Sequence, residues 1–154
     1  MKKFLCLMLS MVLLTFLPVL AFAGETDAAV RNVQIEYFED GTYLVSEIIT
    51  ENNWTRATKS ANKTSTCYSI DNEALWTVKL NAAFSYNGST ATCTAASTDY
   101  TIYDNNWDVV SATASKSGNR ATGEFTVKKY LLGIPIDTKE VTLTLTCSPT
   151  GTIS

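Results

Sequence analysis

The absence of histidine narrows the chemistry open to this 154-residue chain. Histidine is the usual general base for serine and cysteine nucleophiles and a frequent zinc ligand, so sites of those kinds are excluded. Asp104, Asn106 and Asp108 are spaced like the first ligands of an EF-hand loop. However, Val109 occupies the position that needs Gly, and Ser115 the position that needs a bidentate Glu. We therefore expect a turn here and predict no metal and no cofactor.

Paired carboxylates are the remaining route to catalysis. Hydrolysis of a glycosidic bond uses two carboxyl groups about 5 to 10 Å apart, one of them with a raised pKa. Glu39 with Asp40, and Asp71 with Glu73, fall in turn-like segments where acids are usually solvated. Gly-x-Ser-x-Gly and phosphate-loop patterns are absent. We expect no catalytic residues and no enzyme, and a secreted glycoside-type hydrolase is the least favoured hypothesis.

Three aromatic residues are the best candidates for ligand binding. Trp54, Tyr103 and Trp107 lie near expected loops or strand ends, where flat rings can stack on sugar faces. The alternative is that the same rings fill the ends of the hydrophobic core. The two interpretations differ in how exposed these rings are.

The first 23 residues have the pattern of a secretory signal peptide. Lys2 and Lys3 precede an apolar run over residues 4–17, Pro18 follows, and residues 21–23 supply the small-x-small spacing of a cleavage site. We predict cleavage after Ala23 and a secreted, extracellular location. A spanning helix needs about 20 apolar residues, so we expect no membrane span after cleavage.

The mature chain is acidic and has the length of one domain. Cleavage removes Lys2 and Lys3 but no acid, which leaves 10 basic and 15 acidic residues. Phosphate binding needs clustered Lys and Arg, so we expect no nucleic-acid partner. Residues 24–30 are expected to be a flexible N-terminus, followed by a single domain over residues 31–154.

The domain is predicted to be all-β. Trp76, Val78 and Leu80 alternate with polar residues, and Asn87-Gly88 is a strong signal for a two-residue hairpin turn. Polar residues 51–63 are expected to form a loop. The other strands are expected over residues 31–38, 42–50, 64–70, 98–103 and 107–114, near Phe125 and Val127, and before Cys147. Seven or eight strands predict an antiparallel sandwich, immunoglobulin-like in the broad sense, with a small closed barrel as the alternative.

Export allows the three cysteines of the mature chain to form disulfides. If Asn87-Gly88 form the turn, Cys93 lies opposite Ala82 and faces the core, and Cys147 shares a face with Leu145. We therefore predict a Cys93–Cys147 disulfide, with Cys67 free or joining two chains. Pairings that involve Cys67, and three reduced cysteines, are the alternatives.

Several segments resemble a family of small exported proteins from Gram-positive bacteria. They are residues 35–41, 56–60, 86–88, 114–119 and 144–151, and the resemblance covers most of the mature chain. It implies export and a β domain, and it carries over no active site. Cysteines that match Cys93 and Cys147 recur in that family, whereas Cys67 is a departure from its pattern.

These observations favour a binding protein over an enzyme. We expect a small exported module that binds a polysaccharide or another protein at the cell envelope or outside it. The alternative is a freely secreted effector that acts by protein contact.

Overall fold

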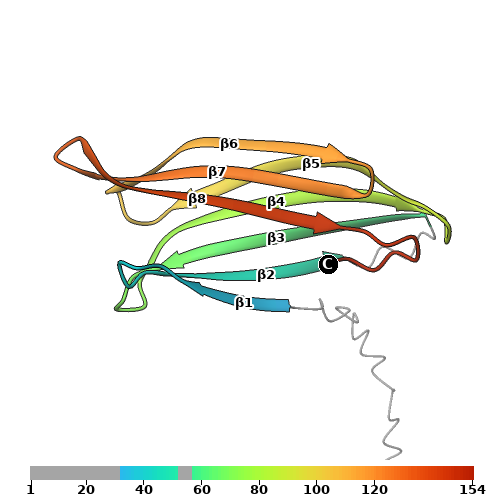
Figure 1. Ribbon diagram of the computed structural model, residues 1–154, viewed down its shortest axis with the longest axis horizontal. Helices are drawn as coiled ribbons and strands as arrows, with labels where there is room; N and C mark the ends of the chain where they lie inside the picture. The colour runs from blue at the N-terminus through green and yellow to red at the C-terminus, as the bar shows by residue number, and fades with distance from the viewer. Residues whose placement is uncertain (1–31, 52–56) are drawn as a thin grey trace, which may run out of the picture.

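The structure is a computed structural model, and it describes residues 32–51 and 57–154. Eight strands form two antiparallel sheets (Figure 1). The large sheet contains β1 (Asn32–Tyr37), β2 (Tyr43–Glu51), β3 (Thr58–Tyr68), β4 (Ala74–Tyr86) and β5 (Ala91–Ile102), and the small sheet contains β6 (Trp107–Ser117), β7 (Arg120–Leu131) and β8 (Ile134–Thr146). The predicted antiparallel sandwich is confirmed, and neighbouring strands in each sheet are consecutive in the chain. The predicted signal peptide, residues 24–30 and Trp54 lie outside the described residues.

The β3 strand is longer than the sequence pattern suggested. It begins at Thr58, within the polar stretch that we expected to be a loop. Its buried positions hold the small residues Ala61, Ser65 and Cys67. Small and hydroxylated side chains give no apolar alternation, so the inward face of β3 could not be recognised from periodicity.

The β4–β5 hairpin has a four-residue turn instead of the expected two-residue turn. The Asn87 side-chain oxygen accepts hydrogen bonds from two backbone amides of the turn, at 3.0 and 2.8 Å. Only Gly88 has a positive φ, of 88°, whereas a type I′ turn needs two such residues. Cys93 consequently lies opposite Phe84 and not Ala82. A shift of two residues preserves the face, so Cys93 still points into the core.

The core lies between β4 and the small sheet. Trp76, Val78, Leu80 and Phe84 are completely buried on β4. The small sheet contributes Phe125, Val127, Leu143 and Leu145, among others. Burying each large apolar side chain contributes about 1.5 to 3 kcal/mol. The alternating residues of β4 therefore provide the main attachment between the sheets.

The two sheets are closed along one side and open along the other. On the closed side β5 meets β6, and the Cys93 amide donates a 2.7 Å hydrogen bond to the Gly118 carbonyl. The small sheet packs over β3, β4 and β5, whereas β1 and β2 extend beyond it. Every residue of β1 is exposed. An open side therefore separates β1 and β2 from β8, the outer strand of the small sheet (Figure 1).

The two ends of the sandwich carry different connections. The turns of β1–β2, β3–β4, β5–β6 and β7–β8 gather at one end, which we call the hairpin end (left in Figure 1). A 2.7 Å hydrogen bond from the Tyr130 amide to the Asn106 carbonyl holds two of these turns together. The C-terminal residues lie at the opposite end.

The C-terminal residues fold back onto β8. Thr146 and Ser154 exchange two backbone hydrogen bonds, of 2.8 and 3.0 Å. Gly151 has a φ of 86°, and its α-carbon faces Tyr86 so closely that a Cβ would lie 2.5 Å from the ring. The Lys59 ammonium also donates a 3.0 Å hydrogen bond to the Gly151 carbonyl.

We predict that Gly151→Ala destabilises the protein more than Gly133→Ala does. Both glycines have positive φ, but a Cβ at Gly133 meets nothing within 4 Å. The left-handed conformation costs an alanine about 1 to 2 kcal/mol at either site. The clash with Tyr86 adds about 1 to 3 kcal/mol at Gly151 alone. Urea unfolding of both variants measures the difference, and equal losses of unfolding free energy would contradict this packing.

Candidate functional site

Exposed apolar side chains are concentrated at the hairpin end. Seven of the eleven large hydrophobic residues that are exposed in the described ranges lie there: Tyr37, Ile70, Tyr103, Leu131, Leu132, Ile134 and Ile136. None of the eleven lies in the turns of the opposite end. Exposed apolar groups gathered in this way mark a contact surface, whereas scattered ones need no explanation.

The β7–β8 turn is the most exposed part of this surface, and we call residues 131–136 the aliphatic tip. Leu132 is 96% exposed, and it adopts a positive φ of 52° next to Gly133 at 81°. A leucine in this conformation is strained by about 1 to 2 kcal/mol, and its exposure returns no burial energy. Strained residues of this kind cluster at functional sites, which makes the tip a candidate for binding.

A row of three tyrosines crosses the outer face of the large sheet near the same end. Tyr37, Tyr43 and Tyr68 are directly opposite one another on β1, β2 and β3. Their ring centroids are 5.7 and 5.3 Å apart, and the second pair is stacked at 17°. The Tyr43 hydroxyl donates a 2.8 Å hydrogen bond to Asn72. Tyr37 is 73% exposed, so this tyrosine row offers an aromatic surface to a ligand.

The predicted stacking residues do not form one site. Tyr103 is exposed at the hairpin end, as the stacking hypothesis requires. Trp107 is only 3% exposed: its ring centroid lies 6.1 Å from that of Trp76, and the Lys129 ammonium lies 5.7 Å from its centre. Trp107 is therefore a core residue with no face free for a ligand. The tyrosine row could not be recognised from the sequence, because the register that aligns its members joins three separate strands.

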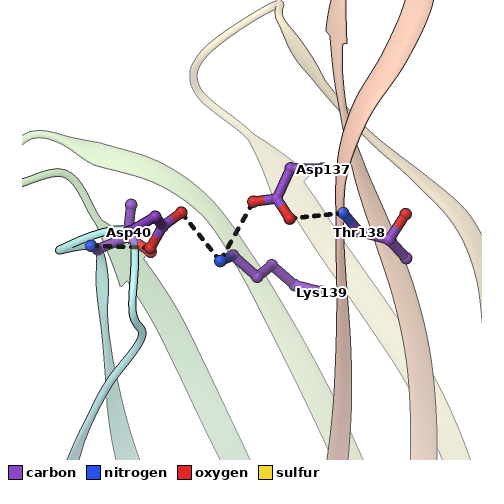
Figure 2. Close-up of polar contacts among 5 residues, drawn as sticks. Asp40, Asp137, Thr138 and Lys139 are labelled. Carbon is purple, nitrogen blue, oxygen red and sulfur yellow. Dashed lines mark hydrogen bonds and ion pairs between the residues drawn. The ribbon is translucent and has the colours of Figure 1, made fainter.

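An ion-pair network around the buried Lys139 joins the β1–β2 turn to β8 (Figure 2). The Lys139 ammonium lies 2.9 Å from Asp40 and 3.1 Å from Asp137. It also sits 4.4 Å from the centre of the Phe38 ring. We call this network the latch, because it holds the overhanging hairpin against the small sheet.

The latch lowers the pKa of Asp40 and raises the pKa of Lys139. Burial alone would raise the pKa of Asp40, but hydrogen bonds from Thr42 and Lys139 outweigh it and lower that pKa from 3.8 to about 2. Burial alone would lower the pKa of Lys139, but the bonds to Asp40 and Asp137 raise it. Both partners are therefore held in their charged forms at neutral pH.

Cys93 and Cys147 lie on either side of the β6–β7 turn. All three are buried, unpaired thiols in the structure. The Cys93 amide donates to the Gly118 carbonyl at 2.7 Å, and the Cys147 amide donates to the Asn119 carbonyl at 3.0 Å. Burial raises the pKa of both thiols, and a charge at Cys93 raises that of Cys147 further. Cys93 and Cys147 are therefore close neighbours around the β6–β7 turn.

Cys67 lies far from this pair. It is opposite Trp76, and Cys93 is opposite Phe84, eight residues further along β4. Eight residues of strand span about 26 Å, far more than the roughly 7 Å limit between the α-carbons of a disulfide. Cys67 is also completely buried, which raises its pKa to about 11 and leaves no access for a cysteine of another chain.

The acidic and cysteine side chains of the described residues do not gather into a metal site. No group of three or more Cys, Asp or Glu side chains in residues 32–51 and 57–154 is placed to hold a metal ion. The Asp104 side chain accepts hydrogen bonds from the Asn106 amide and side chain, which is the geometry of a turn. Glu124 and Glu140 line one depression on the small sheet, but both side chains are exposed. In the same ranges, no helix is long and apolar enough to cross a membrane.

No family model matches the chain, and no curated protein matches it. The chain is similar to a crystal structure of a hypothetical protein from Listeria monocytogenes EGD-e. The identity is 19% and the TM-score 0.43, and the match covers 77% of this chain and 88% of that one.

We predict that Asp40→Asn destabilises the protein in a pH-dependent way. Asp40 has a lowered pKa in the folded state, so it contributes stability above about pH 4, and this contribution is lost as the pH falls towards 2. The side chain is 40% exposed, so solvent screening reduces the contribution to about 1 kcal/mol.

Unfolding free energies measured from pH 7 to pH 2 test this prediction. The difference between wild type and Asp40→Asn should shrink towards zero at the acid end. Asp71→Asn, at an exposed turn residue, is the matched control and should show a smaller difference at pH 7. A constant difference across the pH range would rule out the charged latch.

Proposed function

We propose that this protein is a small exported binding module that contacts its target at the cell envelope or outside the cell through the hairpin end. The concentration of exposed apolar residues at that end carries the proposal. The pattern of residues 1–23 supports export, with cleavage after Ala23.

A polysaccharide is the ligand that the tyrosine row favours. Aromatic rings stack on the apolar faces of sugars, and Tyr37, the exposed ring at the end of the row, is placed to do so. Tyr103 lies at the same end and supplies a further exposed ring. Hydroxyl groups on the tyrosines can hydrogen-bond the polar edges of the sugars.

A protein target is the second candidate, and the aliphatic tip favours it. Leucine and isoleucine side chains offer no hydrogen bonds to sugars, but they fill apolar pockets on proteins. Such a target belongs to the envelope, and a freely secreted effector that acts by protein contact is the alternative.

We further propose that the exported protein contains a Cys93–Cys147 disulfide. Their neighbouring positions around the β6–β7 turn support this pairing, and the location of Cys67 opposes the alternatives. The bridge closes a loop of roughly 55 residues and stabilises the fold by up to about 4 kcal/mol. It also fixes the C-terminal end of β8 to the closed side of the sandwich.

We predict that the double variant Leu132→Ser/Ile134→Ser and the single variant Tyr37→Ser separate the two ligand classes. The purified mature protein is sedimented with isolated Gram-positive cell walls, and the bound fraction is measured. If a polysaccharide is the target, Tyr37→Ser should weaken binding about tenfold, and soluble wall glycan should release the wild type. If a protein is the target, the double variant should show the loss instead.

Val33→Ser is the matched control, because Val33 is an exposed apolar residue of β1 away from the hairpin end. Binding that none of the hairpin-end variants reduces would overturn the proposed function.

We predict that the secreted protein has one disulfide and one buried thiol. Intact mass should be 2 Da below that of the reduced chain, and alkylation should modify one cysteine only after unfolding. Cys93→Ser should lower the unfolding free energy by about 2 to 4 kcal/mol, whereas reduction should not destabilise that variant further. Three alkylated cysteines, or a mapped bridge to Cys67, would refute the pairing.

A further inference from the structure

The C-terminal end of β8 already pairs, along its outer edge, with the last residues of the chain. Thr146 and Ser154 exchange both of their backbone hydrogen bonds, and Ile153 forms an antiparallel bridge with Cys147. The C-terminal residues therefore act as a short extra strand on the side of β8 that faces away from β7. This edge is shaped to accept a strand.

The next part of the same edge is unpaired. In an antiparallel ladder, one residue directs its N–H and C=O to one side and the next residue directs them to the other. The N–H and C=O groups of Thr146 are directed away from β7, towards Ser154. The pairing of β8 with β7 is regular over this stretch, so the N–H and C=O groups of Thr144, Thr142 and Glu140 are also directed away from β7. Among the described residues, no backbone hydrogen bond reaches these three from the open side.

This unpaired stretch forms one wall of a groove of about 370 Å³ on the open side of the sandwich. The latch closes the groove at the hairpin end, and the C-terminal strand occupies the edge at the other end. The opposite wall is formed mainly by the inward faces of β1 and β2, which extend beyond the small sheet. The groove is lined by Gln34, Glu36, Phe38, Leu44, Ser46, Lys63, Ser65 and residues 140–143.

We propose that this groove binds an extended segment of a partner polypeptide, which pairs with residues 140–144 as a fourth strand of the small sheet. Exposed strand edges bind peptides in this way: backbone hydrogen bonds supply affinity, and alternate side chains supply specificity. Inward side chains of the segment meet Leu44 and Ser46, so small or apolar residues fit there. Outward side chains lie beside Thr142, which is exposed to solvent, and Thr144, which is half-buried.

A single strand fits this edge better than a second copy of the protein does. Edge-to-edge pairing of two antiparallel β8 strands requires a two-fold axis perpendicular to the small sheet. Both large sheets would then lie on the same face of the joined small sheets. The β1–β2 hairpins of the two copies would both occupy the space under the paired β8 strands. A lone extended segment has no second sheet and avoids this collision.

The groove is separate from the hairpin-end surface, so each proposal can fail without the other. The tests therefore use a different probe, the synthetic peptide acetyl-Ser-Val-Thr-Val-Thr-Lys-amide. Amide hydrogen exchange is followed by NMR on the mature protein. Exchange at Glu140, Thr142 and Thr144 should be fast in the free protein and at least about tenfold slower with millimolar peptide.

A tethered version raises the effective concentration of the strand. The same six residues are appended after Ser154, where they continue antiparallel to β8. The second, fourth and sixth added residues then lie opposite Thr144, Thr142 and Glu140. An appended Gly-Ser segment of equal length is the control and should give no protection.

Two tryptophan variants test whether the groove itself is the site. Gln34→Trp fills the groove from the inward face of β1, and Val33→Trp places the same side chain on the outward face. Both positions are exposed on an edge strand, so both variants should fold. Protection by the peptide should be lost in Gln34→Trp and kept in Val33→Trp.

Three results would overturn the proposal. The first is no protection at residues 140–144 with either the free or the tethered strand. The second is peptide binding that persists in Gln34→Trp, which would place the peptide elsewhere. The third is protection that rises with protein concentration alone, together with a dimer in analytical ultracentrifugation, which would make a second copy the occupant.

Discussion

The unequal size of the two sheets is the constraint on which the rest of this structure depends. Five strands face three, so β1 and β2 extend past the cover that the small sheet provides. The inward residues of β1 are accordingly polar, and the β1–β2 turn is held to β8 by charge instead of by apolar packing. Lys139 can be buried there because two carboxylates and the Phe38 ring surround its ammonium group.

The meander order of the strands separates the molecule into two unlike ends. Four hairpin turns lie together at one end, and the C-terminal strand fixes the other. Apolar side chains are exposed at the hairpin end even though Leu132 gains nothing from folding in that position. Exposed apolar side chains lower stability and solubility and contribute no burial energy to the fold. Contact with another molecule is the simplest explanation for such a surface.

The sequence was informative where apolar residues alternate and uninformative where small residues replace them. The period-two pattern of Trp76, Val78 and Leu80 predicted the buried face of β4 correctly. The inward position of Cys93 was also predicted correctly despite a wrong turn, because the error in register was two residues. The exposure of the aliphatic tip could not be predicted, since periodicity cannot show that a hairpin projects beyond its neighbours. Trp107 looked like a ligand contact, since its pairing with Trp76 joins separate sheets.

Footprinting of the bound protein tests whether the hairpin end makes the contact with the target. Hydroxyl radicals oxidise exposed aromatic and aliphatic side chains, so the mature protein is labelled free and while bound to isolated Gram-positive envelopes. We expect protection at Tyr37, Tyr103 and residues 131–136, with Tyr86 and Ile153 at the opposite end unchanged. Protection confined to that opposite end, or spread evenly over both ends, would contradict a contact through the hairpin end.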